Sequence, residues 1–131
     1  MREIKFRGKE IKTGKWIYGS LVVDNKGRCF IVPFQSSEKG LKCIEVDKST
    51  VGQFTGLRDR EGREIYEGDI IETEYDRWLV KFDNGSFYGV KPKTGSFLDL
   101  SKETINYYDA IVVGNVFDNP ELLQEGVNHE R

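Results

Sequence analysis

The chain has one histidine and two cysteines, and this scarcity narrows the chemistry open to it. Cys29 and Cys43 are too far apart to form a CxxC redox or zinc motif. We interpret them as buried thiols on strands, and a disulfide between them stays open if their strands pair. His129 lies in the polar C-terminal tail, and the sequence has no GxSxG, phosphate-loop or dinucleotide motif. We therefore expect no metal, no cofactor and no nucleophilic catalysis.

The chain also lacks an excess of basic charge and a long apolar run. Its 131 residues include 20 Lys and Arg against 22 Asp and Glu, a formal net charge of −2. Proteins that bind nucleic acid mainly through phosphates usually carry a basic excess. No apolar run approaches the roughly 20 residues of a membrane-spanning helix, and residues 1–5 lack the apolar core of a signal peptide. We expect a cytoplasmic protein with no membrane partner.

What the chain does contain is a succession of short apolar runs separated by turns rich in Gly, Asn and Asp. The clearest example spans residues 78–90, with Asn84-Gly85 at its centre. This dipeptide suits a two-residue type I′ turn, which predicts a β-hairpin. The predicted register places two pairs of residues opposite one another: Phe82 with Phe87, and Lys81 with Tyr88.

The end of the chain predicts one more strand and little helix. The run Ala110–Phe117 is almost continuously apolar and favours a central or closing strand. Residues 119–123 then predict a single helical turn, with Asn119 as its side-chain cap and Pro120 at its first position.

Short strands at this spacing predict an all-β fold, built from one or two small barrels. We expect an SH3-like barrel over about residues 51–117, with the first fifty residues forming a second β layer packed on it. The predicted organisation is an N-terminal β subdomain at 1–50, the SH3-like barrel with its helical turn at 51–125, and a flexible tail at 126–131.

Three segments resemble the YopX family, small proteins encoded mostly by bacteriophages and prophages. The segments are Arg2–Arg7, Thr55-Gly56-Leu57 through Tyr66–Ile70, and Val113–Leu123. They lie in the expected order and span the chain. The resemblance implies an all-β fold and a phage or prophage origin. It brings no established activity and no catalytic residues.

An acidic cluster in the central segment has two interpretations. Paired carboxylates could serve a hydrolase or hold a hard cation. The simpler interpretation is a solvated hairpin tip followed by a turn, because arginines interrupt the acidic residues. Asp69, before a predicted strand, is expected to accept backbone N–H groups. The cluster consists of Asp59, Glu61, Glu64, Glu67 and Asp69. We favour the simpler interpretation and expect no enzyme.

Binding is therefore the favoured class of function, and the chain offers one candidate surface. Its members are Arg58, Arg60, Arg63, Trp78 and Tyr88. The aromatic residues could pack in the core or provide stacking surfaces, as small β-barrels do for single-stranded nucleic acid. We expect a non-enzymatic binding or adaptor module with a protein partner or a second copy of itself. The alternative is a weak single-stranded nucleic-acid-binding accessory protein in phage replication or regulation.

Overall fold

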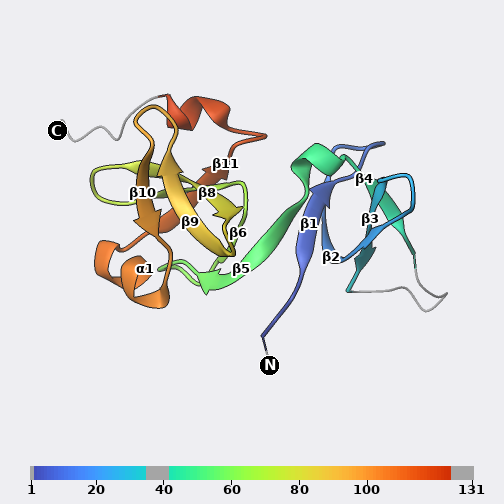
Figure 1. Ribbon diagram of the computed structural model, residues 1–131, viewed down its shortest axis with the longest axis horizontal. Coiled ribbons are helices and arrows are strands. Elements are labelled where there is room, and N and C mark those ends of the chain that lie inside the picture. The colour runs from blue at the N-terminus through green and yellow to red at the C-terminus, as the bar shows by residue number, and fades with distance from the viewer. Residues whose placement is uncertain (1, 35–41, 125–131) are drawn as a thin grey trace. The chain divides into compact units, whose positions relative to one another are not determined.

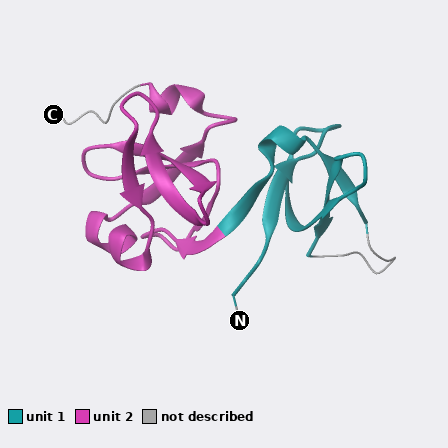
Figure 2. Cartoon of the chain, viewed as in Figure 1, with its two compact units in different colours: residues 1–54 teal, residues 55–131 magenta. Residues whose placement is uncertain are grey.

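The computed structural model of the protein describes residues 2–34 and 42–124, which contain two antiparallel sheets. The expected all-β class is confirmed. The chain divides into two compact units, residues 1–54 and residues 55–131 (Figure 2). Strand β5 (Gly52–Arg58) contains the division, so its first residues belong to unit 1 and its last to unit 2. No helix in the described ranges is long and apolar enough to cross a membrane.

Unit 1 is built from short antiparallel strands in the order β4-β3-β2-β1-β5 (Figure 1). Ile31 and Val46 are buried at its centre. The elements of unit 1 before β5 are β1 (Phe6–Lys9), β2 (Trp16–Val23), β3 (Cys29–Pro33), β4 (Ile44–Val46) and the 3-10 turn η1 (Lys48–Thr50). Pro33 ends β3, as a residue without a backbone N–H tends to do.

Both cysteines of unit 1 are free thiols, so the disulfide that the sequence left open is absent. The prediction that both are buried is wrong, because Cys29 is half-buried and Cys43 is exposed. The register explains why they do not meet. Cys29 pairs with Val46, whereas Cys43 lies just outside the opposite end of β4.

Unit 2 contains a sheet with the strand order β10-β9-β8-β7-β11. Its elements after β5 are β6 (Glu64–Tyr66), β7 (Asp69–Glu72), β8 (Arg77–Asp83), β9 (Ser86–Lys91), β10 (Ser96–Asp99), α1 (Lys102–Tyr108), β11 (Ile111–Asn115) and the 3-10 turn η2 (Pro120–Leu123). The buried residues of its core are Ile65, Ile71, Trp78, Val80, Ile105 and Ala110. Burial of these apolar side chains is the main stabilising contribution to unit 2.

The predicted hairpin is confirmed in both its turn and its register. Strands β8 and β9 pair Lys81 with Tyr88 and Phe82 with Phe87. Asn84 and Gly85 both have positive φ, at 51° and 79°, as a type I′ turn requires. The Phe82 ring lies 4.8 Å from the Phe87 ring, centroid to centroid. The turn chemistry therefore determined which residues face one another.

Replacing Gly85 with alanine is expected to lower the free energy of unfolding by about 1 kcal/mol, because a Cβ is strained at this φ. The added methyl group meets no atom within 4 Å, so the backbone conformation alone causes the loss. Urea unfolding measures the difference. Ser86→Ala, a change at the next exposed residue, is the control and should stay close to the wild type.

Two features of the C-terminal half differ from the sequence predictions. The helix α1 was not predicted; its first turn is capped by Ser101, whose hydroxyl accepts a hydrogen bond from the Thr104 N–H at 3.1 Å. The predicted cap at Asn119 is wrong. Its side-chain oxygen accepts a hydrogen bond from the Asn115 N–H, at 3.2 Å, instead of capping η2. The sequence left open a central or a closing strand for Ala110–Phe117, and β11 lies at the end of the sheet order.

Candidate binding surface

The three arginines of the predicted surface are exposed and form ion pairs with neighbouring carboxylates. Arg58 lies 3.2 Å from Glu64, and Arg60 lies 3.7 Å from Glu61. Arg63 pairs with Glu61 as well, and it lies 3.6 Å from a carboxylate oxygen of Asp59. The carboxylates that alternate with the arginines in sequence therefore offset much of their positive charge.

Asp59 is buried, so the prediction of a solvated hairpin tip is wrong for this residue. One of its carboxylate oxygens accepts the N–H groups of Glu61 and Arg63, at 2.9 and 2.8 Å. The other accepts the N–H of Val112 in β11 at 2.9 Å. Asp59 thereby fastens the β5–β6 loop to the last strand of unit 2, which is a structural role.

Asp69 is also buried and also serves the backbone. Its carboxylate accepts the N–H of Tyr66 at 2.7 Å, as the turn before β7 predicted. Glu64 accepts hydrogen bonds from Arg58 and from the Tyr66 hydroxyl. These carboxylates are engaged in the hairpin and its turn. Within residues 2–34 and 42–124, no group of three or more His, Cys, Asp or Glu is arranged to hold a metal ion.

The two aromatic members of the predicted surface differ in their surroundings. Trp78 belongs to the core of unit 2, and its indole N–H donates to the Thr73 hydroxyl at 3.4 Å. Tyr88 is half-buried on β9, and its ring meets that of Phe97 edge-on, with 5.5 Å between centroids. Trp78 therefore fits the core-packing interpretation, while one side of it also lines a hollow.

Five aromatic side chains line this hollow in unit 2, and we call it the aromatic hollow. It lies where the β7–β8 turn, β10, the end of α1 and the start of β11 come together, and its volume is about 970 Å³. The aromatic residues that line the hollow are Tyr75, Trp78, Phe97, Tyr107 and Tyr108, and Arg60 lines it as well. Arg60 and Trp78 are thus brought together, whereas Arg58, Arg63 and Tyr88 do not line the hollow.

Most of these rings are open to solvent. Tyr75 is 67% exposed, Phe97 71% and Tyr107 79%, while Trp78 lies beneath them at 9%. The Tyr107 and Tyr108 rings are perpendicular, with 4.8 Å between centroids. Apolar side chains gathered on a surface in this way mark interaction sites more often than scattered ones do.

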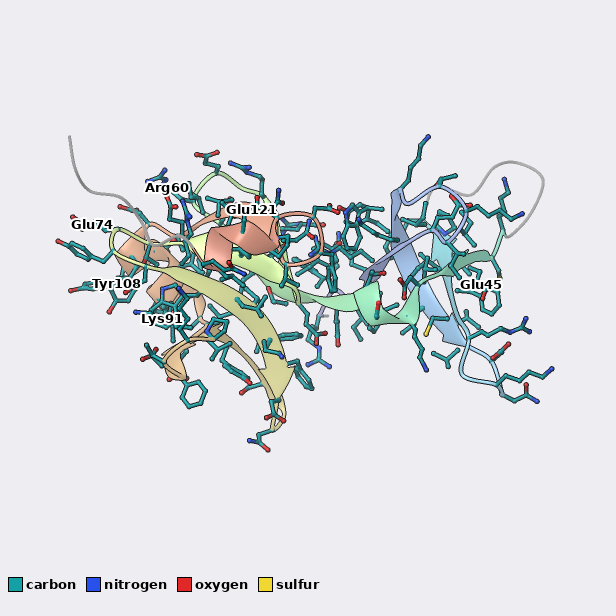
Figure 3. The ribbon with its side chains drawn as sticks, turned by 90° about the horizontal axis from the view of Figure 1, so that it is seen from above. Glu45, Arg60, Glu74, Lys91, Tyr108 and Glu121 are labelled. Carbon is teal, nitrogen blue, oxygen red and sulfur yellow. The ribbon has the colours of Figure 1, made fainter. Side chains whose placement is uncertain are left out.

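The hollow also carries four carboxylates at its rim: Glu72, Glu74, Asp76 and Asp109. Figure 3 shows Glu74, Tyr108 and Lys91 at the same end of unit 2 as Arg60. The Glu74 carboxylate accepts a hydrogen bond from the Tyr75 hydroxyl, and this bond raises the pKa of Tyr75 above its ordinary value.

Sequence reasoning missed Tyr75, Phe97, Tyr107 and Tyr108. Nothing in the sequence signalled the Tyr107-Tyr108 pair, because the helix α1 that carries both residues was not predicted. The side chains that the hollow collects are far apart in sequence. Only the paired strands and α1 bring them together.

A hollow in unit 1 has mixed charge. Its basic lining residues are Lys9, Lys26, Arg28 and Lys48, and its acidic ones are Glu10, Glu45 and Asp47. The basic residues of this hollow therefore lie among carboxylates, which disfavours a site for phosphate groups.

The family model described as YopX protein matches residues 5–124. The chain belongs to the YopX family. Among solved structures, the YopX-family chain is similar to the crystal structure of protein EF1440 from Enterococcus faecalis. The similarity has a TM-score of 0.62 at 24% sequence identity and covers 94% of this chain and 99% of that one. It supports the fold alone. No curated protein matches the chain significantly.

Proposed function

We propose that this YopX-family protein acts by binding, without catalysis, and that its aromatic hollow receives a segment of a partner protein. The observation that carries the proposal is the gathering of four exposed aromatic rings around one hollow. Tyr, Trp and Phe are enriched at the centres of protein interfaces, where they contribute much of the binding energy. A partner that covers these rings would remove a large apolar area from water.

The hollow suits a chain segment better than a small molecule. Its volume is typical of a ligand pocket, but such pockets enclose most of the ligand, whereas these rings stand open to solvent. The rings also belong to regular elements: Phe97 to β10, and both Tyr107 and Tyr108 to α1. Buried Ile105 anchors α1 in the core. A pre-formed surface loses little conformational entropy on binding.

Catalysis has less support. A carboxylate-dependent hydrolase would bring several acidic groups of the central segment into one cleft. Asp59 and Asp69 instead accept backbone N–H groups, and neither lines the aromatic hollow. Nucleic-acid binding has one observation in its favour, the position of Arg60 among exposed rings. However, Arg60 is paired with Glu61, and the four rim carboxylates repel phosphate groups.

Replacing Phe97 or Tyr107 with serine is expected to weaken peptide binding at least about tenfold, because each ring is an exposed anchor at the hollow. Peptides are selected from a random display library on the wild-type protein, synthesised, and titrated by fluorescence anisotropy. The substituted rings are mostly solvent-exposed, so folding should be preserved.

The matched control is Phe82→Ser, which removes a ring that is 47% exposed on the same sheet but outside the hollow. It should bind selected peptides as the wild type does. Equal losses in all three variants, or none in any, would contradict the assignment of the site. Binding of oligodeoxythymidine that depends on Phe97 and Tyr107 would favour the nucleic-acid alternative.

A cytoplasmic location and a phage or prophage origin stay part of the proposal. A binding module of this kind would act on a host or phage protein, or on a second copy of itself. Native mass spectrometry of the purified protein distinguishes self-association from binding to another protein. A self-associating protein would give a dimer mass without any added partner.

A further inference from the structure

The charge balance of the aromatic hollow points to the chemistry of its partner. Two of its carboxylates are matched by cations of the same unit: Glu72 lies 2.8 Å from Arg77, and Asp76 lies 2.8 Å from Lys91. Within the described residues, neither Glu74 nor Asp109 has an ion-pair partner. Glu74 instead accepts the neutral Tyr75 hydroxyl. Arg60, a cation that also lines the hollow, pairs with Glu61, so the four carboxylates leave the rim around the rings with a net negative charge.

The protein's own Lys91 shows how a cation is held on this part of the sheet. Its ammonium lies 5.7 Å from the centroid of the Trp78 ring and 2.8 Å from the Asp76 carboxylate. An aromatic face attracts a cation through its quadrupole, and a nearby carboxylate adds a charge-assisted hydrogen bond. Glu74 and Asp109 stand beside further rings, Tyr75 and Tyr108, that could hold a second cation in the same way.

The edge of the sheet suggests the conformation of the partner. Strand β10 is last in the order β10-β9-β8-β7-β11, and Phe97 and Leu98 of this strand line the hollow. An edge strand can pair with an extended segment, whose alternate side chains then reach neighbouring pockets. A segment that follows β10 would place its side chains over the rings.

We infer that the aromatic hollow selects an extended, positively charged protein segment, in which a Lys or Arg side chain packs over the exposed rings and is held by Glu74 and Asp109. This inference rests on the proposed function. The long stem of a Lys or Arg side chain covers apolar surface while its head group reaches a carboxylate. Opposite charges across the interface also speed association and exclude acidic competitors.

The test is a random-peptide display selection, performed in parallel on the wild type and on a Glu74→Gln/Asp109→Asn double variant. Asparagine retains the left-handed backbone of Asp109, whose φ is 50°. The wild type should enrich Lys- and Arg-containing peptides, and the double variant should lose that enrichment. Synthetic peptides from the wild-type pool should bind the double variant at least tenfold more weakly, with a shallower salt dependence.

The control variant is Glu103→Gln, which removes an exposed negative charge from α1 without touching the lining of the hollow. It should keep both the enrichment and the affinity. Neutral or acidic peptides that compete for the hollow and depend on Phe97 would overturn the inference but leave the proposed function intact. Failure to obtain any peptide that depends on Phe97 or Tyr107 would overturn both. The affinity of oligodeoxythymidine for the double variant is measured as well. If it exceeds the affinity of every selected peptide for that variant, the inference is also overturned.

Discussion

Replacing Asp59 with alanine is expected to lower the free energy of unfolding of unit 2 by about 3–5 kcal/mol, because it leaves three backbone N–H groups without their shared acceptor. The carboxylate accepts the N–H groups of Glu61, Arg63 and Val112 at 2.8–2.9 Å. Its side chain has no exposed area, so water cannot replace those bonds without opening the loop. A loss of this size is a large part of the 5–15 kcal/mol that stabilises a typical domain.

Asparagine at the same position should have an intermediate effect, about 2 kcal/mol. Its amide has one acceptor oxygen, so it can keep the pair of bonds within the loop or the bond to β11, but it places an N–H₂ group against the remaining donor. Urea unfolding in a Trp16→Phe background measures both variants. In this background Trp78 is the only tryptophan, and it reports on the core of unit 2.

Glu61→Ala is the matched control for Asp59→Ala. Glu61 is an acidic residue of the same loop and also pairs with Arg63, but about half of its side chain is exposed. Exposed ion pairs contribute little, so the expected loss is below about 1 kcal/mol. Similar losses for Asp59→Ala and Glu61→Ala would show that the carboxylate does not hold β11 in place.

The parts of the fold that could be predicted are those whose causes lie within a few residues. Asn84-Gly85 determines the turn, and the turn determines which strand residues pair. Asp69 follows a glycine and begins strand β7, where a short carboxylate can reach backbone N–H groups. Each of these features depends on local geometry, so a single sequence contains the necessary information.

The helix α1 could not be predicted in this way. Its sequence, Lys102–Tyr108, includes β-branched and aromatic residues with weak helix propensity. It is stabilised by the Ser101 cap and by burial of Ile105 against the sheet, and the second of these depends on the whole unit. Without α1, the two tyrosines that line the hollow had no predicted position.

The candidate surface shows the same limit. The sequence indicated Arg60 and Trp78, because an arginine in a loop and a tryptophan in a strand are each common in binding surfaces. It could not show that Phe97 and Tyr107 lie beside them, since they come from separate elements. It also left open which carboxylates neutralise the arginines and which remain at the rim of the hollow.

Gly19 is a further position whose role depends on a distant strand. It lies in β2, between Phe6 of β1 and Pro33 of β3. A Cβ at Gly19 would lie 2.0 Å from the Val32 carbonyl oxygen and 2.9 Å from the Pro33 Cα. Both atoms belong to the backbone, so no side-chain rotation can relieve the clash. The pairing of β2 with β3 requires a residue without a side chain here.

Replacing Gly19 with alanine is therefore expected to lower the free energy of unfolding of unit 1 by about 3 kcal/mol or more, at the upper end of the cost of overpacking. Amide hydrogen exchange measures the effect strand by strand. Protection should fall in β2 and β3, and strands β8 and β9 of unit 2 serve as the internal reference. The result identifies the pairing that the methyl group breaks.

Two substitutions separate this steric effect from simpler causes. Ser20→Ala changes the exposed neighbour of Gly19 and should leave the exchange rates unchanged. Gly27→Ala places a methyl group in open space at a φ of 83°, so it should cost only about 1 kcal/mol, from backbone strain. If Gly19→Ala costs no more than Gly27→Ala, β2 and β3 can move apart without loss, and the close approach at Gly19 does not stabilise unit 1. If the loss is the larger one expected, the close approach of β2 and β3 is a requirement of the fold, which the sequence around Gly19 does not reveal.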